Sequence, residues 1–142
     1  MPTVPREVWV DTGRGRLYAK IWNATFTTRA PFVLFHDSLG CVELWRDFPE
    51  QLSAATERAV IAYDRLGFGR SDPHPGELGL DFIHDEARVA LPLLRKQFAF
   101  ERFVAFGHSV GGGMAIECAG AFPDTCAALI TESAQTFVEE RA

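Results

Sequence analysis

The sequence contains a serine whose neighbours favour nucleophilic chemistry, Ser109 in the pentapeptide Gly107–Gly111, Gly-His-Ser-Val-Gly. The pentapeptide follows an apolar run and precedes a helical pattern that begins near Val110. A serine at such a strand-to-helix turn takes a strained positive φ and extends its hydroxyl clear of the backbone. The flanking glycines, Gly107 and Gly111, let the strand and the helix approach closely. The spacing therefore predicts that Ser109 is an exposed nucleophile.

Such a nucleophile needs hydrogen-bond donors for the negative charge that develops on a carbonyl oxygen of the substrate. A helix that begins at Val110 directs its first N–H groups and the positive end of its dipole at this place, so the Val110 N–H is the first expected donor. The segment His36–Gly40, His-Asp-Ser-Leu-Gly, follows an earlier buried strand, and we expect the Ser38 N–H to be the second donor. The alternative is that this segment is only a turn, for which Asp, Ser and Gly are all suited.

A serine hydroxyl also needs a histidine base that is oriented by a carboxylate. All four histidines precede Ser109 in the sequence: His36, His74, His84 and His108. We expect His36 to organise its turn, and His108 to point away from the Ser109 hydroxyl because neighbouring side chains of an elbow diverge. Glu132 ends the last apolar run, so it is predicted either to line the pocket or to serve as the catalytic acid.

The elements that must position these residues alternate along the chain. The patterns predict strands at 8–11, 17–22, 32–35, 59–63, 102–107 and 127–131, and helices at 45–56, 82–98 and 110–122. This order is typical of an α/β fold with a mostly parallel sheet, an antiparallel leading hairpin and flanking helices. The length of 142 residues fits one domain, so residues 1–142 are assigned to a single core. The Gly- and Pro-rich loop 64–79 contains Asp64 and Arg65, which we interpret as residues that organise a turn.

Composition excludes several classes of function. A content of 47% hydrophobic residues predicts a globular chain, and a formal net charge of −5 without a basic stripe excludes nucleic acid as a partner. The sequence has no apolar stretch long enough to span a membrane and no signal-peptide pattern, so we expect a cytoplasmic location. The three cysteines lack metal-type spacing, and neither a metal nor an organic cofactor is expected.

Three segments in this order, 36–40, 64–71 and 107–112, resemble the serine-nucleophile members of the α/β-hydrolase fold superfamily. The resemblance implies Ser109 as the nucleophile, with Ser38 and Val110 as oxyanion-hole donors. It also implies a small-molecule acyl substrate, cleaved at an ester, a related acyl bond or an activated carbon–carbon bond through an acyl-enzyme. In the superfamily the acid and the histidine follow later strands, so the chain is expected to be the N-terminal part of the core and to lack those strands. Asp37 stands where the superfamily more often has Gly, which would polarise the mouth of the pocket.

Two other functions fit the same residues. Without its histidine the chain could be a catalytically incomplete ligand-binding module or fragment, and the same serine site could support a cofactor-free, peroxidase-type activity. If Ala142 is the native terminus, the sheet ends on an unpaired apolar strand, which predicts a homo-oligomer. If it is not, a further C-terminal polypeptide supplies the rest of the site.

Overall fold

The structure is a computed structural model that describes residues 4–76, 79 and 81–135. Within these residues the strands are β1 (Arg6–Asp11), β2 (Arg16–Trp22), β3 (Phe32–Phe35), β4 (Val60–Tyr63), β5 (Phe103–His108) and β6 (Cys126–Glu132). The helices are α1 (Phe48–Thr56), α2 (Phe82–Phe98) and α3 (Val110–Ala121), with a short 3₁₀ turn, η1 (Val42–Trp45), before α1. Every predicted strand and helix is present, with its ends displaced by at most three residues.

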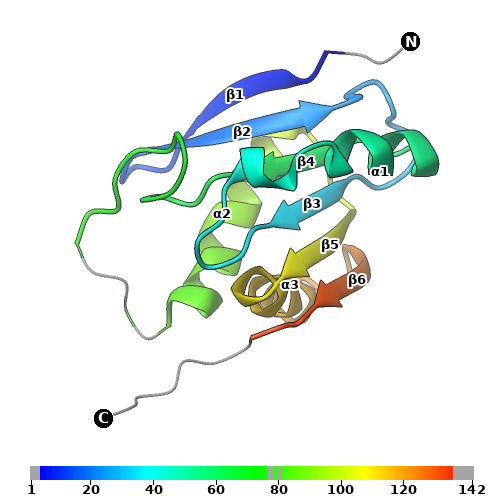
Figure 1. The fold of residues 1–142 in the computed structure, drawn as a ribbon. Coiled ribbons are helices and arrows are strands. Elements are labelled where there is room, and N and C mark those ends of the chain that lie inside the picture. Colours follow the sequence, from blue (N-terminus) through cyan, green and yellow to red (C-terminus); the bar gives the residue numbers. More distant parts are fainter. Residues whose placement is uncertain (1–3, 77–78, 80, 136–142) are drawn as a thin grey trace.

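The strands form one sheet in the order β1-β2-β4-β3-β5-β6 (Figure 1). β1 and β2 are an antiparallel hairpin, β2 also pairs antiparallel with β4, and β3, β4, β5 and β6 run parallel. The predicted fold class, a mostly parallel sheet led by an antiparallel hairpin, is therefore confirmed. The carboxyl ends of the parallel strands β3, β4 and β5 lie at the same end of the sheet, so the segments that follow these strands converge there.

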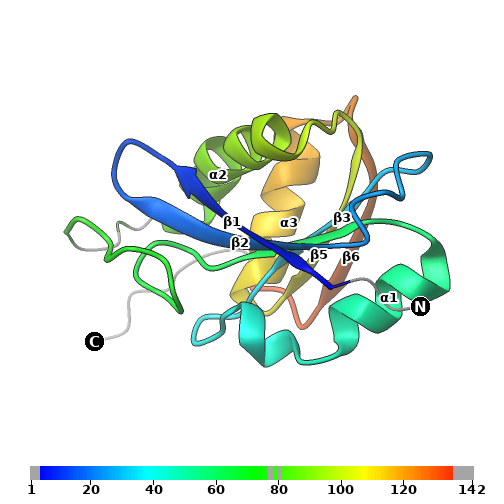
Figure 2. The ribbon, with the colours of Figure 1, turned by 90° about the horizontal axis from the view of Figure 1, so that it is seen from above.

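Helices cover both faces of the sheet (Figure 2): α2 and α3 lie on one face and α1 on the other. Every residue of β3 and β4 is buried, as expected for central strands of a parallel sheet. Val33 and Phe35 face the core beneath α2 and α3, whereas Phe32 and Leu34 face the core beneath α1. Because the side chains of β3 face the two cores in turn, both helical layers pack against the strand that leads into the loop after Phe35.

The helix predicted from residue 45 begins later than the apolar spacing suggests. Trp45 belongs to η1, and Arg46 at φ 56° and ψ −124° interrupts the chain before α1, which has Pro49 in its first turn. Proline favours the first helical turn because its fixed φ suits a helix and it has no N–H to leave unpaired. Trp45 still packs with Phe48 at 5.9 Å between ring centroids, so the apolar face was predicted correctly although the helix start was not.

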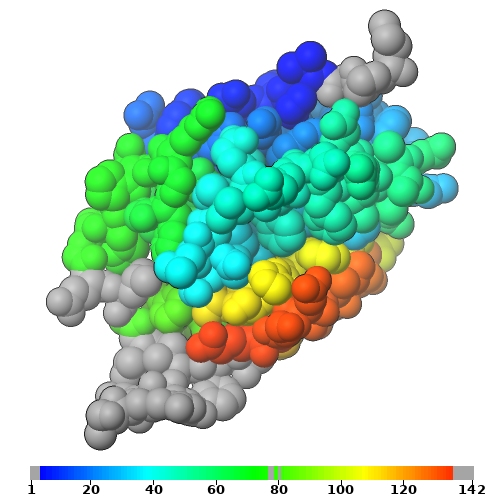
Figure 3. All heavy atoms as spheres, viewed as in Figure 1, coloured from blue at the N-terminus to red at the C-terminus, as the bar shows by residue number. Residues whose placement is uncertain are grey.

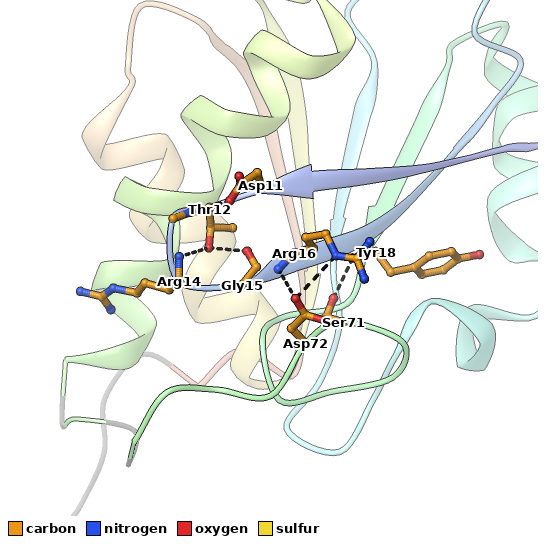
Figure 4. Close-up of polar contacts among 9 residues, drawn as sticks. Asp11, Thr12, Arg14, Gly15, Arg16, Tyr18, Ser71 and Asp72 are labelled. Carbon is orange, nitrogen blue, oxygen red and sulfur yellow. Dashed lines mark hydrogen bonds and ion pairs between the residues drawn. The ribbon is translucent and has the colours of Figure 1, made fainter.

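The β1–β2 turn is tied to the loop that follows β4 (Figure 4). Asp72 accepts the Arg16 N–H at its Oδ2 (2.7 Å) and donates its own N–H to the Arg16 carbonyl (2.9 Å). Ser71 Oγ accepts the Tyr18 N–H at 2.8 Å, and the Tyr18 carbonyl accepts the Asp64 N–H at 2.9 Å. These bonds continue the β2 ladder beyond the end of β4, and they hold the loop 64–72 against the sheet.

β6 forms one edge of the sheet, and its residues are exposed or partly exposed. Leu129 and Ile130 are each 41% exposed. In the described ranges no other strand pairs with the outer side of β6. No helix in the same ranges is long and apolar enough to cross a membrane.

Candidate active site

Ser109 occupies the turn between β5 and α3 in a strained conformation. Its φ is 56° and its ψ is −119°, a combination that residues with a Cβ rarely adopt. Main-chain hydrogen bonds of 2.9 Å hold the turn from both sides: the Ser109 N–H donates to the Glu132 carbonyl, and the Ser109 carbonyl accepts the Gly112 N–H. The strain is thus sustained by β6 and α3. No hydrogen bond joins the Ser109 hydroxyl to a side chain among the described residues.

The glycines around Ser109 allow two close backbone approaches. A Cβ on Gly107 would overlap the main chain of Gly111, so this glycine lets β5 and α3 meet. A Cβ on Gly111 would overlap the carbonyl oxygen of Phe35, at the end of β3. The start of α3 therefore rests directly on the backbone that leads into the loop 36–40.

The two N–H groups predicted to stabilise an oxyanion are both unengaged in the described part of the chain. Val110 is the first residue of α3, so its N–H has no partner within the helix. The Ser38 N–H likewise has no hydrogen-bond acceptor among the described residues. In Figure 3 the cyan surface of the loop after β3 meets the yellow surface where β5 gives way to α3. The structure thus brings together the two segments that carry the candidate donors.

His36 is buried and has two hydrogen-bond partners. Its Nδ1 lies 2.7 Å from the Asp37 carbonyl, and its Nε2 lies 3.1 Å from the Arg65 main-chain nitrogen. The neutral ring with its proton on Nδ1 satisfies both contacts, since Nδ1 then donates and Nε2 accepts. Burial, with a further contribution from the Arg65 charge, lowers the pKa of His36 to about 3. His36 is therefore a neutral organiser of the loop.

This low pKa predicts a pH dependence of stability. Above about pH 6.5 the His36 ring is neutral in the folded and unfolded chain, and its stabilising contribution is complete. As the pH falls from 6.5 towards 3, only the unfolded chain binds the proton at His36, so the contribution of His36 to the free energy of unfolding should fall by up to about 1.4 kcal/mol per pH unit. Urea unfolding of the wild type and His36→Gln at pH 7, 6 and 5 should show a shallower dependence in the variant. Parallel pH dependences of the two proteins would contradict this account.

Asp64 is more deeply embedded than a turn residue needs to be. It is 1% exposed, and its carboxylate accepts the N–H groups of Val42 (2.6 Å) and Arg70 (2.8 Å). Burial raises the pKa of Asp64, while these two hydrogen bonds act in the opposite direction. Sequence reasoning placed Asp64 in a turn but missed this link between η1 and the loop after β4. The only signal was an acidic residue directly after a buried strand.

Glu132 and His108 lie next to the elbow but form no triad with Ser109. His108 Nδ1 is 3.6 Å from Glu132 Oε1, and His108 Nε2 is 3.9 Å from Asp37 Oδ2. The two other histidines engage elsewhere: His84 Nδ1 lies 2.9 Å from Glu117, and His74 Nδ1 lies 3.0 Å from the Gly76 carbonyl. Glu132 therefore has His108 as its neighbour, and no histidine of the described ranges bonds to the Ser109 hydroxyl.

A cavity of about 230 Å³ adjoins the loop that carries Ser38. Ser38 and Arg65 contribute to its wall, and its apolar lining consists of Leu17, Leu66, Phe68, Phe82, Val89 and Ala90. Glu86 is a polar group in this lining, and its carboxylate accepts a hydrogen bond from the Tyr63 hydroxyl at 2.8 Å. Burial raises the pKa of Glu86. The cavity could thus hold a small group with an apolar part beside the loop that carries Ser38.

Residues 30–142 match the family model described as alpha/beta hydrolase fold, and the chain belongs to this family. The structure agrees, because it superimposes with a TM-score of 0.74 on a CIB-like hydrolase from Thermoplasma acidophilum, over 92% of this chain and 63% of that one. The sequence identity to that hydrolase is 24%, so the likeness concerns the fold alone. The expected family is confirmed.

Two curated relatives are similar in sequence. The chain is 31% identical to the (lyso)-N-acylphosphatidylethanolamine lipase of Bos taurus, over 78% of this chain and 33% of the lipase. It is 27% identical to the 1-acylglycerol-3-phosphate O-acyltransferase ABHD5 of Mus musculus, over 81% of this chain and 32% of that protein. The chain thus spans about a third of the length of these relatives.

Proposed function

We propose that this chain supplies the nucleophile and the oxyanion hole of a serine hydrolase that acts on an ester or a related acyl bond. The observation that carries the proposal is the strained Ser109 at the start of α3, together with the N–H groups of Val110 and Ser38, which have no acceptor among the described residues. Strain of this kind persists only where the surrounding structure imposes it, and it concentrates at functional sites. A serine hydroxyl near N–H groups that can bind an oxyanion is the arrangement that acyl transfer requires.

In the proposed reaction Ser109 Oγ attacks the carbonyl carbon of the substrate and gives up its proton to a histidine base. The carbonyl oxygen becomes an oxyanion that accepts hydrogen bonds from the Ser38 and Val110 N–H groups. When this intermediate collapses, the leaving alkoxide takes the proton from the histidine and departs as the alcohol, and an acyl-enzyme remains. Water then attacks the acyl group and releases the acid. The histidine is proposed to lie outside residues 1–142, as the superfamily order implies.

Two observations support an acyl substrate. The cavity beside Ser38 has apolar side chains in its lining, among them Leu66, Phe82 and Val89, which suit a hydrocarbon group. The two curated relatives are named as a lipase and an acyltransferase, and both names describe chemistry at acyl groups.

The test is a p-nitrophenyl ester assay on the protein as its natural source makes it, with intact-mass analysis at early times. We expect release of p-nitrophenolate together with a species that is heavier by one acyl group. If neither p-nitrophenolate release nor the acylated species is found with acetyl, butyryl and octanoyl esters, the proposal is wrong.

The cavity makes a separate prediction about substrate length. Val89 lines the cavity from α2 and is 46% exposed, so a tryptophan at this position can fill the space without a buried clash. Val89→Trp should lower kcat/KM for the octanoyl ester at least about tenfold relative to the acetyl ester, because lost apolar contacts discriminate by this amount. Ile116→Trp, at a similarly exposed position on α3 outside the cavity lining, is the control and should leave the ratio unchanged. If the octanoyl-to-acetyl ratio of kcat/KM is the same in both variants, the substrate does not occupy the cavity.

A second candidate function is a ligand-binding module that lacks turnover. It is favoured by one observation: no histidine of the described ranges bonds to Ser109. In that case octanoate should bind with an affinity that Val89→Trp weakens, whereas the ester assay should remain negative.

A further inference from the structure

The side chain of Arg65 is directed at the backbone of the loop that carries Ser38. Its Nη1 donates to the His36 carbonyl at 2.6 Å and its Nη2 to the Asp37 carbonyl at 2.7 Å. Arg65 is 5% exposed, and its guanidinium carbon lies 4.9 Å from the centre of the Phe68 ring. The planar fork of the guanidinium thus spans two consecutive carbonyl groups of one loop.

This contact bears on the Ser38 N–H, because the Asp37 carbonyl and the Ser38 N–H belong to the same peptide group. In a trans peptide these two groups point in opposite directions, and the described residues contain no cis peptide. The Asp37 oxygen accepts from Arg65, from His36 Nδ1 at 2.7 Å and from the Gly40 N–H at 3.2 Å. Because three donors hold the Asp37 carbonyl, the Ser38 N–H of the same peptide must face the other way.

The charge of Arg65 is not explained by an ion pair. Among the described residues it has no carboxylate oxygen within 4.0 Å, the limit for a salt bridge. The carboxylates nearby are engaged with other groups: Asp64 accepts from Val42 and Arg70, Glu86 from Tyr63, and Asp37 from the Leu39 N–H. Burial of an arginine that is paired only with carbonyl oxygens is unfavourable, and burial lowers the pKa of Arg65 accordingly. Besides the Phe68 ring, the two carbonyl groups of the loop are the partners of this buried charge among the described residues.

We propose that Arg65 is a positioning residue that orients the Asp37–Ser38 peptide so that the Ser38 N–H is available to the oxyanion at Ser109. The proposal rests on the proposed function. In this role Arg65 acts through the loop 36–40 and does not need to contact the substrate. Lysine cannot reproduce it, because an ammonium group cannot span two carbonyl oxygens in one plane.

The experiment compares the wild type with Arg65→Met and Arg65→Lys by the rate of Ser109 phosphonylation with a fluorophosphonate and by ¹H–¹⁵N spectra of serine-labelled protein. Residues 1–142 include five serines, and Ser38→Ala identifies the Ser38 signal. Arg70→Met is the control, because Arg70 lies in the same loop but its side chain reaches Glu7, at 3.3 Å, and not the loop 36–40.

We expect Arg65→Met to slow phosphonylation about 100-fold, the effect of removing one oxyanion donor, and to shift or broaden the Ser38 signal while Ser53 and Ser133 stay in place. Arg65→Lys should be intermediate, and Arg70→Met should match the wild type. An unmoved Ser38 signal in Arg65→Met would overturn the proposal, and if that variant does not fold, an unmoved signal in Arg65→Lys would do so. If the wild type takes up no label, the proposed function fails, and the Ser38 signal alone decides the positioning role.

Discussion

Gly111→Ala is expected to destabilise the fold by at least about 3 kcal/mol, at the upper end of the range for overpacking. The added Cβ would overlap the carbonyl oxygen of Phe35 and would also crowd that of His36. Both are main-chain atoms at the end of a buried strand, so no rotamer change can relieve the clash. Either α3 moves off the sheet, or β3 and the loop 36–40 are displaced together. Urea unfolding measures the loss directly.

The matched control for this substitution is Gly120→Ala in the same helix. A Cβ at Gly120 would have no neighbouring heavy atom within 4 Å, so this change should be neutral or should stabilise the protein by up to about 1 kcal/mol, as alanine does in a helix. Equal stabilities of the two variants would mean that the contact between the start of α3 and β3 does not exist in solution.

Ser109→Ala is expected to abolish the adduct that a fluorophosphonate forms with the protein. The probe reacts with an activated hydroxyl, and alanine offers none while it keeps a Cβ at the same strained position. Ser109→Gly should lose the adduct too, yet it should stabilise the fold by about 1 kcal/mol because glycine adopts positive φ without strain. Opposite effects on labelling and stability would be the signature of a residue held in strain for function.

Intact-mass analysis compares the probe adducts of both variants with that of the wild type. A wild-type adduct that both substitutions remove, found with a species heavier than 15.8 kDa or with a second chain, would show an activated serine that residues outside 1–142 complete. An adduct that survives in Ser109→Ala would place the nucleophile elsewhere. A chain that never takes up the probe would favour the ligand-binding alternative.

The sheet and the elbow could be predicted from the sequence because both leave local signals. Continuous apolar runs such as 32–35 are typical of strands buried on both faces, and they alternate with helical periodicity. The glycines at 107 and 111 mark backbone approaches that tolerate no side chain. The start of α1 was misplaced because Arg46 breaks the helix through its backbone conformation, whereas the spacing of Trp45 and Phe48 continues without interruption.

The support of the candidate oxyanion loop could not be predicted in the same way. Arg65 binds main-chain carbonyl groups and Asp64 binds main-chain N–H groups. Almost every residue has such groups, so the sequence does not indicate which of them are the partners. A charged pair after a buried strand is compatible with an ordinary turn, and only the three-dimensional arrangement shows that both side chains are buried. The likeness to known hydrolases identifies the fold and leaves these contacts to be found in the structure.

The measurement that tests the central claim most directly is a crystal structure of the phosphonylated protein. The phosphonyl group on Ser109 imitates the tetrahedral intermediate, and its oxygen occupies the place of the oxyanion. We expect this oxygen to lie about 2.7–3.1 Å from both the Ser38 and the Val110 main-chain nitrogens. A phosphonyl oxygen that points to solvent, or that contacts neither nitrogen, would contradict the assignment of these two groups as the oxyanion hole.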